Sequence, residues 1–131
     1  MIRKYQNLKI WEKATELALR AYDLTRAFPR EEIYALSSQI RRSAVSVPSN
    51  IAEGSERKSD KEFVRFLRIA SASLAELETQ LYIAEKLGYI ASESYESFLD
   101  ISAENGKMIN GLISKLEAMP ASGDWRLATG D

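Results

Sequence analysis

The sequence predicts an all-α fold, an antiparallel up-down-up-down four-helix bundle. Apolar residues recur at spacings of three and four in four separate segments of the 131-residue chain, which is the period of helices with one buried face. No stretch of useful length alternates apolar and polar residues as a half-buried strand does. The connections between the segments are short, so consecutive helices are expected to pack as antiparallel neighbours.

The first predicted helix covers residues 8–27. Asn7 is its expected N-cap, because a short polar side chain there can accept a backbone hydrogen bond. Its apolar face consists of Leu8, Ile10, Trp11, Ala14, Leu17, Ala18, Ala21, Tyr22, Leu24 and Phe28. Pro29 ends this helix, because the residue before a proline avoids helical backbone angles.

The second predicted helix begins near Glu31 and ends at Gly54, a residue type that commonly follows helices. Glu31 and Glu32 lie in its first turn, where the helix dipole favours negative charge. Its apolar positions are Ile33, Leu36, Ile40, Ala44, Val47 and Ile51. Pro48 falls inside this pattern and removes the backbone hydrogen bond to the carbonyl of Ala44. The apolar spacing continues past the proline, so we predict one helix kinked at Pro48.

Polar residues surround this proline and are predicted to be structural. Ser46, Asn50 and Glu53 are expected to hydrogen-bond around the kink and to a neighbouring helix, because buried polar groups need partners. With Pro48 and Gly54 they form the predicted structural group. The alternative is that Glu53 and Asn50 belong to a ligand-binding or catalytic site, although no companion residue for Glu53 is visible in the sequence.

The third predicted helix runs from Ser59 to Leu87 and opens with a capping box between Ser59 and Glu62. Its apolar seam alternates by four and three without a miss, as in a coiled coil. The seam consists of Phe63, Leu67, Ala70, Leu74, Leu77, Leu81 and Ala84. Phe66, Ile69 and Ile83 lie outside the seam, and such leftover apolar surface is typical of subunit contacts.

The fourth predicted helix starts after Ser92 and runs to about Ala118. Its apolar face consists of Phe98, Ile101, Met108, Ile109, Leu112, Ile113 and Leu116, interrupted by Asn105, Gly106 and Gly111. We expect one domain, a bundle at residues 1–119. Residues 120–131 have no helical pattern and are expected to form a flexible C-terminal tail, from which Trp125 could dock.

The composition argues against an enzyme. The chain contains no cysteine and no histidine, so Ser-His-Asp and Cys-His mechanisms cannot be built from it. The Glu-x-x-His motifs of di-iron bundles are missing, and none of the 6 glycines belongs to a phosphate-binding loop. We therefore predict no catalytic residues, no metal and no cofactor. No apolar run is long enough for a signal peptide or a membrane span, so we expect a cytoplasmic protein with no membrane partner.

The net charge of −1 predicts no global attraction to nucleic acid, but the charges are uneven along the chain. Residues 1–68 hold 14 Lys and Arg against 9 Asp and Glu, whereas residues 69–131 hold 4 against 10. This asymmetry is typical of a chain with a basic surface, or of antiparallel helices that place opposite charges side by side. The second interpretation is favoured.

The densest basic stretch spans residues 39–68 and holds the candidate contacts to nucleic acid or to another partner. These candidates are Arg41, Arg42, Arg57, Lys58, Arg65 and Arg68. Lysines and arginines on one surface can contact phosphates. The favoured alternative is structural, because the same window holds the acids Glu53, Glu56, Asp60 and Glu62 as potential ion-pair partners.

Residues 39–54 read Gln-Ile-Arg-Arg-Ser-Ala-Val-Ser-Val-Pro-Ser-Asn-Ile-Ala-Glu-Gly. This segment resembles the hallmark of a bacterial four-helix-bundle family, the 23S rRNA intervening-sequence proteins, with its Arg-Arg, Ser-x-Pro and Asn-Ile-Ala-Glu-Gly. The likeness covers roughly residues 5–118. Elsewhere it rests on Leu8 and Trp11, on Phe28-Pro29 and Glu32, on Phe63 and Phe66-Leu67, on Ser73 and Glu76-Leu77-Glu78, and on Leu87-Gly88-Tyr89.

The resemblance implies a protein without enzymatic activity. The family is similar to the accessory variability proteins of diversity-generating retroelements, which assemble as ring-like pentamers and contact nucleic acid and a reverse transcriptase through a basic surface. It therefore implies a homopentamer, with Arg41, Arg42, Arg57 and Lys58 as the first candidate contacts. This chain differs from the strongly basic retroelement members, since its net charge is −1.

Three functional hypotheses follow, in order of preference. The first is a non-catalytic oligomeric scaffold that binds copies of itself, with another protein as the alternative partner. The second is an accessory protein that binds structured RNA or DNA through the basic surface around residues 41–68. The third is a ligand-binding bundle or enzyme that uses Glu53 and Asn50.

Overall fold

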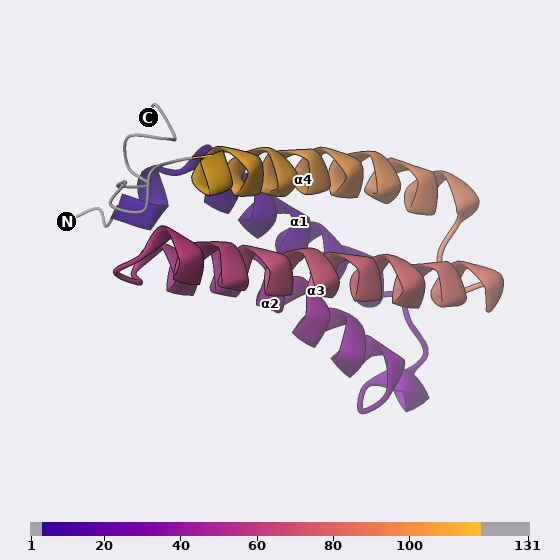
Figure 1. Cartoon of the computed structure of the whole chain (residues 1–131). Coiled ribbons are helices and arrows are strands. Elements are labelled where there is room, and N and C mark those ends of the chain that lie inside the picture. The colour runs from indigo at the N-terminus through magenta and orange to yellow at the C-terminus, as the bar shows by residue number, and fades with distance from the viewer. Residues whose placement is uncertain (1–3, 119–131) are drawn as a thin grey trace.

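The computed structural model describes residues 4–118 and confirms an all-α, four-helix architecture (Figure 1). The elements in chain order are the 3-10 helix η1 (Lys4–Asn7), α1 (Lys9–Thr25), the 3-10 helix η2 (Arg30–Glu32), α2 (Leu36–Ser55), α3 (Asp60–Lys86) and α4 (Ser92–Ala118). Residues 4–118 contain no strand. The predicted tail, residues 120–131, lies outside the described residues, so the domain boundaries stay a prediction.

The four helices pack their apolar faces into one core, and α2 makes its most extensive contact with α3. Each helix contributes side chains that are completely removed from solvent. These include Leu17 of α1, Ile40 and Ile51 of α2, Phe63, Leu67, Leu77 and Leu81 of α3, and Phe98 and Ile109 of α4. The predicted seam of α3 is buried along its whole length, so this helix faces the core from Phe63 to Ala84.

Polar side chains bridge the buried helices. The hydroxyls of Ser46 on α2 and Ser73 on α3 lie 2.8 Å apart, and the Ser43 hydroxyl donates to Glu76 Oε1 at 3.0 Å. On the other side of α3, the Ser102 hydroxyl of α4 donates to the carboxylate of Glu78. Such bonds are specific in position, unlike apolar contacts, so they fix how far one helix slides along the next.

The start of α1 differs from the prediction by one residue. Asn7 belongs to η1, so Leu8 takes the extended N-cap conformation, and α1 begins at Lys9 without a side-chain cap. Leu8 is buried at this position. Packing of the apolar residue therefore takes precedence over capping by the polar one.

The start of α2 was also wrongly predicted. Arg30–Glu32 form a separate 3-10 turn, and α2 begins only at Leu36. The Glu32 carboxylate accepts a hydrogen bond from the backbone N–H of Leu36 at 3.3 Å and from the hydroxyl of Tyr89 at 2.7 Å. This side chain supplies a hydrogen-bond partner at the new helix start, and Ile33, expected in the core, is exposed.

α2 remains one continuous helix across Pro48, as predicted, while the kink itself stays a prediction. Gly54 was expected to end the helix but does not: α2 continues to Ser55, and Gly54 keeps a negative φ. Its role is close packing, because a Cβ at this position would lie 2.6 Å from Phe66 Cβ and 2.9 Å from Phe63 Cδ1. By contrast, Gly88 takes φ 82° just after α3, where the sequence predicted that helix to end.

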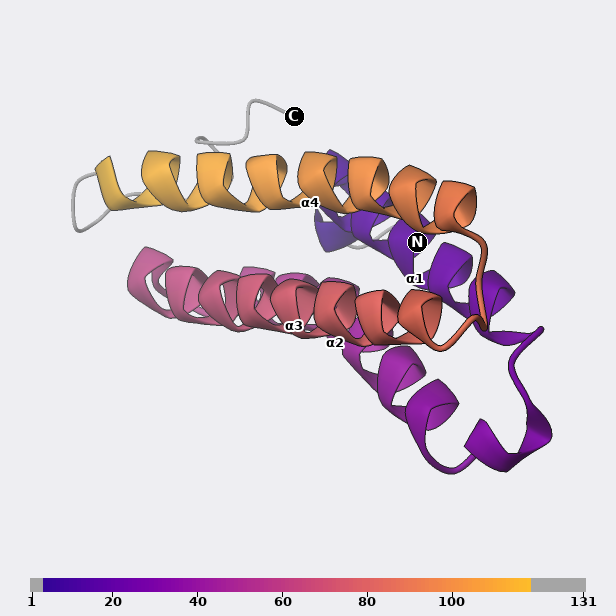
Figure 2. The same ribbon diagram turned by 90° about the vertical axis from the view of Figure 1, so that its right-hand side faces the viewer.

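The starts of α3 and α4 agree with the sequence. The Ser59 hydroxyl accepts a hydrogen bond from the backbone N–H of Glu62 at 3.2 Å, which is the predicted N-terminal half of a capping box. α4 begins at Ser92 and extends to Ala118. Figures 1 and 2 show α3 and α4 running side by side over their length, while the first turns of α2 and the preceding η2 lean away from this pair.

Gly54→Ala is expected to destabilise the protein. The added methyl has no room against Phe63 and Phe66, and overpacking of this kind costs about 1–3 kcal/mol. The matched control is Gly111→Ala in α4, where an added Cβ meets no other atom within 4 Å and helix propensity should add about 1 kcal/mol of stability. Urea unfolding followed by circular dichroism gives both values. Equal stability of the two variants would contradict the close approach of α2 to α3.

Candidate interaction surfaces

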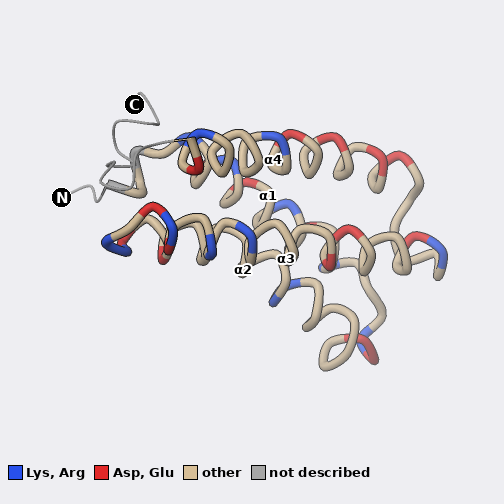
Figure 3. Tube along the Cα trace, viewed as in Figure 1, with Lys and Arg blue, Asp and Glu red and all other residues tan. Residues whose placement is uncertain are grey.

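The structure separates the six candidate cations into two groups (Figure 3). Arg41 and Arg42 lie in the N-terminal half of α2, whereas Arg57, Lys58, Arg65 and Arg68 follow its C-terminal end, in the turn before α3 and the first turns of α3. Each helical residue adds about 1.5 Å, so the stretch of α2 from Arg42 to Ser55 separates the groups by about 20 Å. The candidates do not form one continuous surface.

Three of the four cations at the α2–α3 turn are in ion pairs. Arg57 lies 3.5 Å from Glu53, Arg65 lies 3.3 Å from Glu62, and Arg68 lies 2.8 Å from Glu117. The guanidinium groups of Arg57 and Arg65 also lie over the ring of buried Phe66, at 4.7 and 4.6 Å from its centroid. Two of these acids, Glu53 and Glu62, are partners that the structural alternative predicted. Lys58 has no ion-pair partner among residues 4–118.

The polar residues around Pro48 form hydrogen bonds within α2 and to α3. The amide nitrogen of Asn50 donates to the carbonyl of Ser46 at 2.8 Å and to its hydroxyl at 2.9 Å. The Ser46 hydroxyl then reaches Ser73, as described above. The side chain of Glu53 is 57% exposed beside Arg57, so it stands in solvent rather than in an enclosed site with Asn50.

An apolar surface with two arginines lies between α1 and α2. It surrounds an open pocket of about 470 Å³, and we call it the α1–α2 surface. Its members are Tyr22, Ile33, Tyr34, Ser38, Arg41, Arg42 and Val45. Tyr34 is 96% exposed, Ile33 49% and Val45 43%. This site was not predicted from the sequence, because the apolar spacing of α2 assigns Ile33 to the core. The signal in the sequence that could have predicted it is Val45, an apolar residue of α2 that lies outside the apolar spacing of this helix.

The two arginines of the α1–α2 surface are held differently. Arg41 Nε donates to Thr25 Oγ1 at 2.9 Å, and its guanidinium lies 4.8 Å from the centre of the Tyr22 ring. These contacts tie α2 to α1. Arg42 is exposed and has no ion-pair partner in the described part of the chain. Arg42 is therefore the cation of this surface that remains available to a partner.

Tyr89, which is distant in the sequence, contacts the connection between α1 and α2 that contains Ile33 and Tyr34. The Tyr89 hydroxyl donates to Glu32 Oε2 at 2.7 Å, and the Tyr89 ring packs 5.3 Å from that of Phe28. The hydrogen bond to the Glu32 carboxylate raises the pKa of Tyr89 above its ordinary value of 10.0, because ionisation would break the bond and place two negative charges together. Tyr89 thus joins the end of α3 to the entrance of α2.

Acidic residues gather on the N-terminal half of α4, as the red segments in Figure 3 show. We define the acidic α4 surface by the exposed side chains of Glu93, Glu96, Asp100 and Glu104. Glu104 pairs with Lys13 of α1 at 3.7 Å, so neighbouring helices do place some opposite charges side by side, as expected. The other three acids have no ion-pair partner among residues 4–118.

Comparison with known proteins identifies the family. Residues 6–111 match the model of the family described as 23S rRNA-intervening sequence protein. The chain belongs to this family. A crystal structure of a protein of unknown function from the S23 ribosomal protein family of Bacteroides thetaiotaomicron is similar, with a TM-score of 0.71 and 30% sequence identity over 79% of this chain and 97% of that chain. No curated protein matches.

Membership of the 23S rRNA-intervening sequence protein family confirms the resemblance and the fold. The family motif at residues 39–54 forms most of α2, the helix that contributes Arg41 and Arg42 to the α1–α2 surface and Gly54 to the contact with α3. Within residues 4–118 no group of three or more acidic side chains is placed to hold a metal ion. No helix in that part is long and apolar enough to cross a membrane.

Tyr89→Phe is expected to lower stability at neutral pH, because it leaves the Glu32 carboxylate without its tyrosine partner. Since the folded-state pKa of Tyr89 is raised, the bond stabilises the protein fully below pH 10 and is lost as pH rises through the folded-state pKa. The difference between wild type and variant should therefore disappear at high pH. Urea midpoints between pH 7 and 11 measure it, with Tyr82→Phe, at an exposed position outside the α1–α2 surface, as the control that should show no difference.

Proposed function

We propose that this protein is a non-catalytic interaction bundle that assembles with copies of itself through the α1–α2 surface, working in the cytoplasm. The observation that carries the proposal is the exposure of Tyr34, Ile33 and Val45 around one open pocket beside Arg42. Clustered exposed apolar side chains are typical of protein contacts. Tyrosine and arginine are also the residue types that most often dominate the energy of such contacts.

The acidic α4 surface supports a second copy as the partner. Arg42 has no ion-pair partner within the described chain, and Glu93, Glu96 and Asp100 have none either, so the two surfaces carry complementary charges. A contact between two different surfaces of one chain is head-to-tail, and such contacts produce closed rings when the rotation between copies closes. A ring of five copies is what the resemblance to the retroelement accessory proteins implies, and we propose that number.

The assembly is tested by its mass in solution. Light scattering on a sizing column at moderate salt should give a mass of about five times 14.8 kDa for the wild type. The double variant Tyr34→Ala/Arg42→Glu should elute at lower mass, because it removes the exposed aromatic ring and reverses the free charge of the α1–α2 surface. Lys58→Glu, at the other end of α2, is the matched control and should keep the wild-type mass.

Two outcomes would overturn the proposed assembly. A wild-type monomer at micromolar concentration would show that the exposed apolar side chains do not mediate self-association. An oligomer whose mass is unchanged by Tyr34→Ala/Arg42→Glu would place the contact elsewhere on the bundle. Circular dichroism establishes that each variant remains folded.

The second candidate function is nucleic-acid binding at the α2–α3 turn. Lys58 and Lys61 favour it, since both are exposed there without an ion-pair partner among residues 4–118. The ion pairs of Arg57, Arg65 and Arg68 weigh against it, because paired cations release fewer counterions on binding phosphate.

Binding of structured RNA should distinguish the two candidate functions. The self-assembly proposal expects no RNA binding that survives 200 mM salt. Nucleic-acid binding would instead show log affinity falling linearly with log salt concentration, by about 0.7–0.9 for each phosphate neutralised. Lys58→Glu/Lys61→Glu would then lower this slope by about 2. Fluorescence anisotropy across a salt series measures the slope, and Arg41→Glu/Arg42→Glu tests the other basic group.

A further inference from the structure

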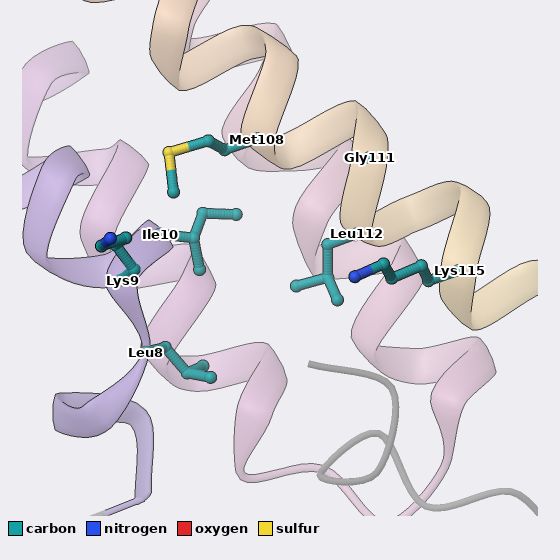
Figure 4. A pocket seen from close by; sticks show the side chains of 7 residues that line it. All are labelled: Leu8, Lys9, Ile10, Met108, Gly111, Leu112 and Lys115. Atoms are coloured by element: carbon teal, nitrogen blue, oxygen red, sulfur yellow. The ribbon is translucent and has the colours of Figure 1, made fainter. Parts of the chain in front are cut away.

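A second, smaller pocket lies between the start of α1 and the last turns of α4 and shares no lining residue with the α1–α2 surface (Figure 4). Its volume is about 260 Å³. The apolar lining comes from Leu8, Ile10, Met108 and Leu112, whose side chains are directed toward a common space. Gly111 leaves the wall open, because a Cβ there would meet no atom within 4 Å. We call this the α1–α4 pocket. It is an apolar cavity that no side chain of residues 4–118 fills.

The rim of the α1–α4 pocket is positively charged. Lys9 and Lys115 both line it, and neither has an ion-pair partner within residues 4–118. α1 also begins at this pocket, and Leu8 provides no side-chain hydrogen bond to the free N–H groups of its first turn. Those groups carry the positive end of the helix dipole. The pocket is thus suited to an occupant that combines a large apolar side chain with a negative charge.

The chain carries such an occupant close by. α4 ends at Ala118, less than one turn beyond Lys115, and the 13 residues that follow include the dipeptide Asp124-Trp125. We propose that the segment after Ala118 folds back on the bundle and seats the Trp125 ring in the α1–α4 pocket, with the Asp124 carboxylate beside Lys9 and Lys115. The inference is independent of the proposed self-assembly, which uses a different surface.

Reach and attachment both favour this occupant. The seven residues that follow Ala118, up to and including Trp125, span up to about 23 Å when extended. This is ample, because the α4 residues of the lining, Met108 to Lys115, lie within about 15 Å of Ala118 along the helix. Because the segment is covalently joined to the bundle, its effective concentration at the pocket is in the millimolar range, which a free ligand rarely reaches. Tryptophan is also among the side chains whose burial contributes most to a contact.

Fluorescence tests the proposal, since the chain contains only 2 tryptophans. In a Trp11→Phe background, Trp125 is the sole emitter, and its emission should be blue-shifted and poorly quenched by acrylamide. Gly111→Leu fills the pocket from an open helix position and should return Trp125 to solvent-like emission. A docked-to-free ratio of about 10, equivalent to about 1.4 kcal/mol, would make quenching about tenfold weaker before this substitution than after it.

Ser114→Leu is the matched control, because it adds the same side chain to an exposed position of α4 outside the pocket lining and should leave the emission unchanged. Lys115→Glu is a second test that leaves the pocket volume unfilled. It should weaken docking of the segment, because it reverses one of the two rim charges. Solvent-like emission of Trp125 in the Trp11→Phe protein would overturn the proposal, as would protection that Gly111→Leu leaves intact. Protection that vanishes on dilution would show that the segment comes from another copy and would also overturn it.

Discussion

The close approach of α2 to α3 is the constraint on which the rest of the structure depends. Gly54 lies directly against Phe63 and Phe66, where a methyl group would not fit. The Ser46–Ser73 and Ser43–Glu76 bonds then set the position of one helix along the other. With this pair fixed, α1 packs on α2 and α4 packs on α3, so the apolar faces of four amphipathic helices meet in one core.

The same constraint creates the surface that we propose as an interface. α2 is held against α3, while its first turns and the preceding η2 lean away from the α3–α4 pair (Figure 2). The side chains of Ile33 and Tyr34 in this projecting part therefore remain exposed. Tyr89, which follows α3, reaches this part through its hydrogen bond to one oxygen of the Glu32 carboxylate, and the other oxygen accepts from the backbone N–H of Leu36.

The sequence allowed the helices to be predicted wherever their limits depend on nearby residues. The seam of α3, the Ser59 cap and the end of α3 before Gly88 follow from spacing, capping chemistry and backbone sterics within a few positions. The errors arose where a residue distant in the sequence determines the limit of a helix or the role of a residue. At the start of α2, Glu32 is bonded to Tyr89, which is 57 positions away. The packing role of Gly54 depends on Phe63 and Phe66 of the next helix.

The candidate site shows the same division. A basic stretch can be read from the sequence, but which cations are free depends on partners such as Glu117, which is 49 positions from Arg68. Cations without an ion pair within residues 4–118 include Arg42, Lys58, Lys9 and Lys115. Arg42 lies at the α1–α2 surface, and Lys9 and Lys115 line the α1–α4 pocket, so three of these four cations border an apolar pocket. A chain with net charge −1 exerts little attraction at a distance, so recognition at such places depends on shape and apolar burial, with the local charge selecting the orientation of the partner.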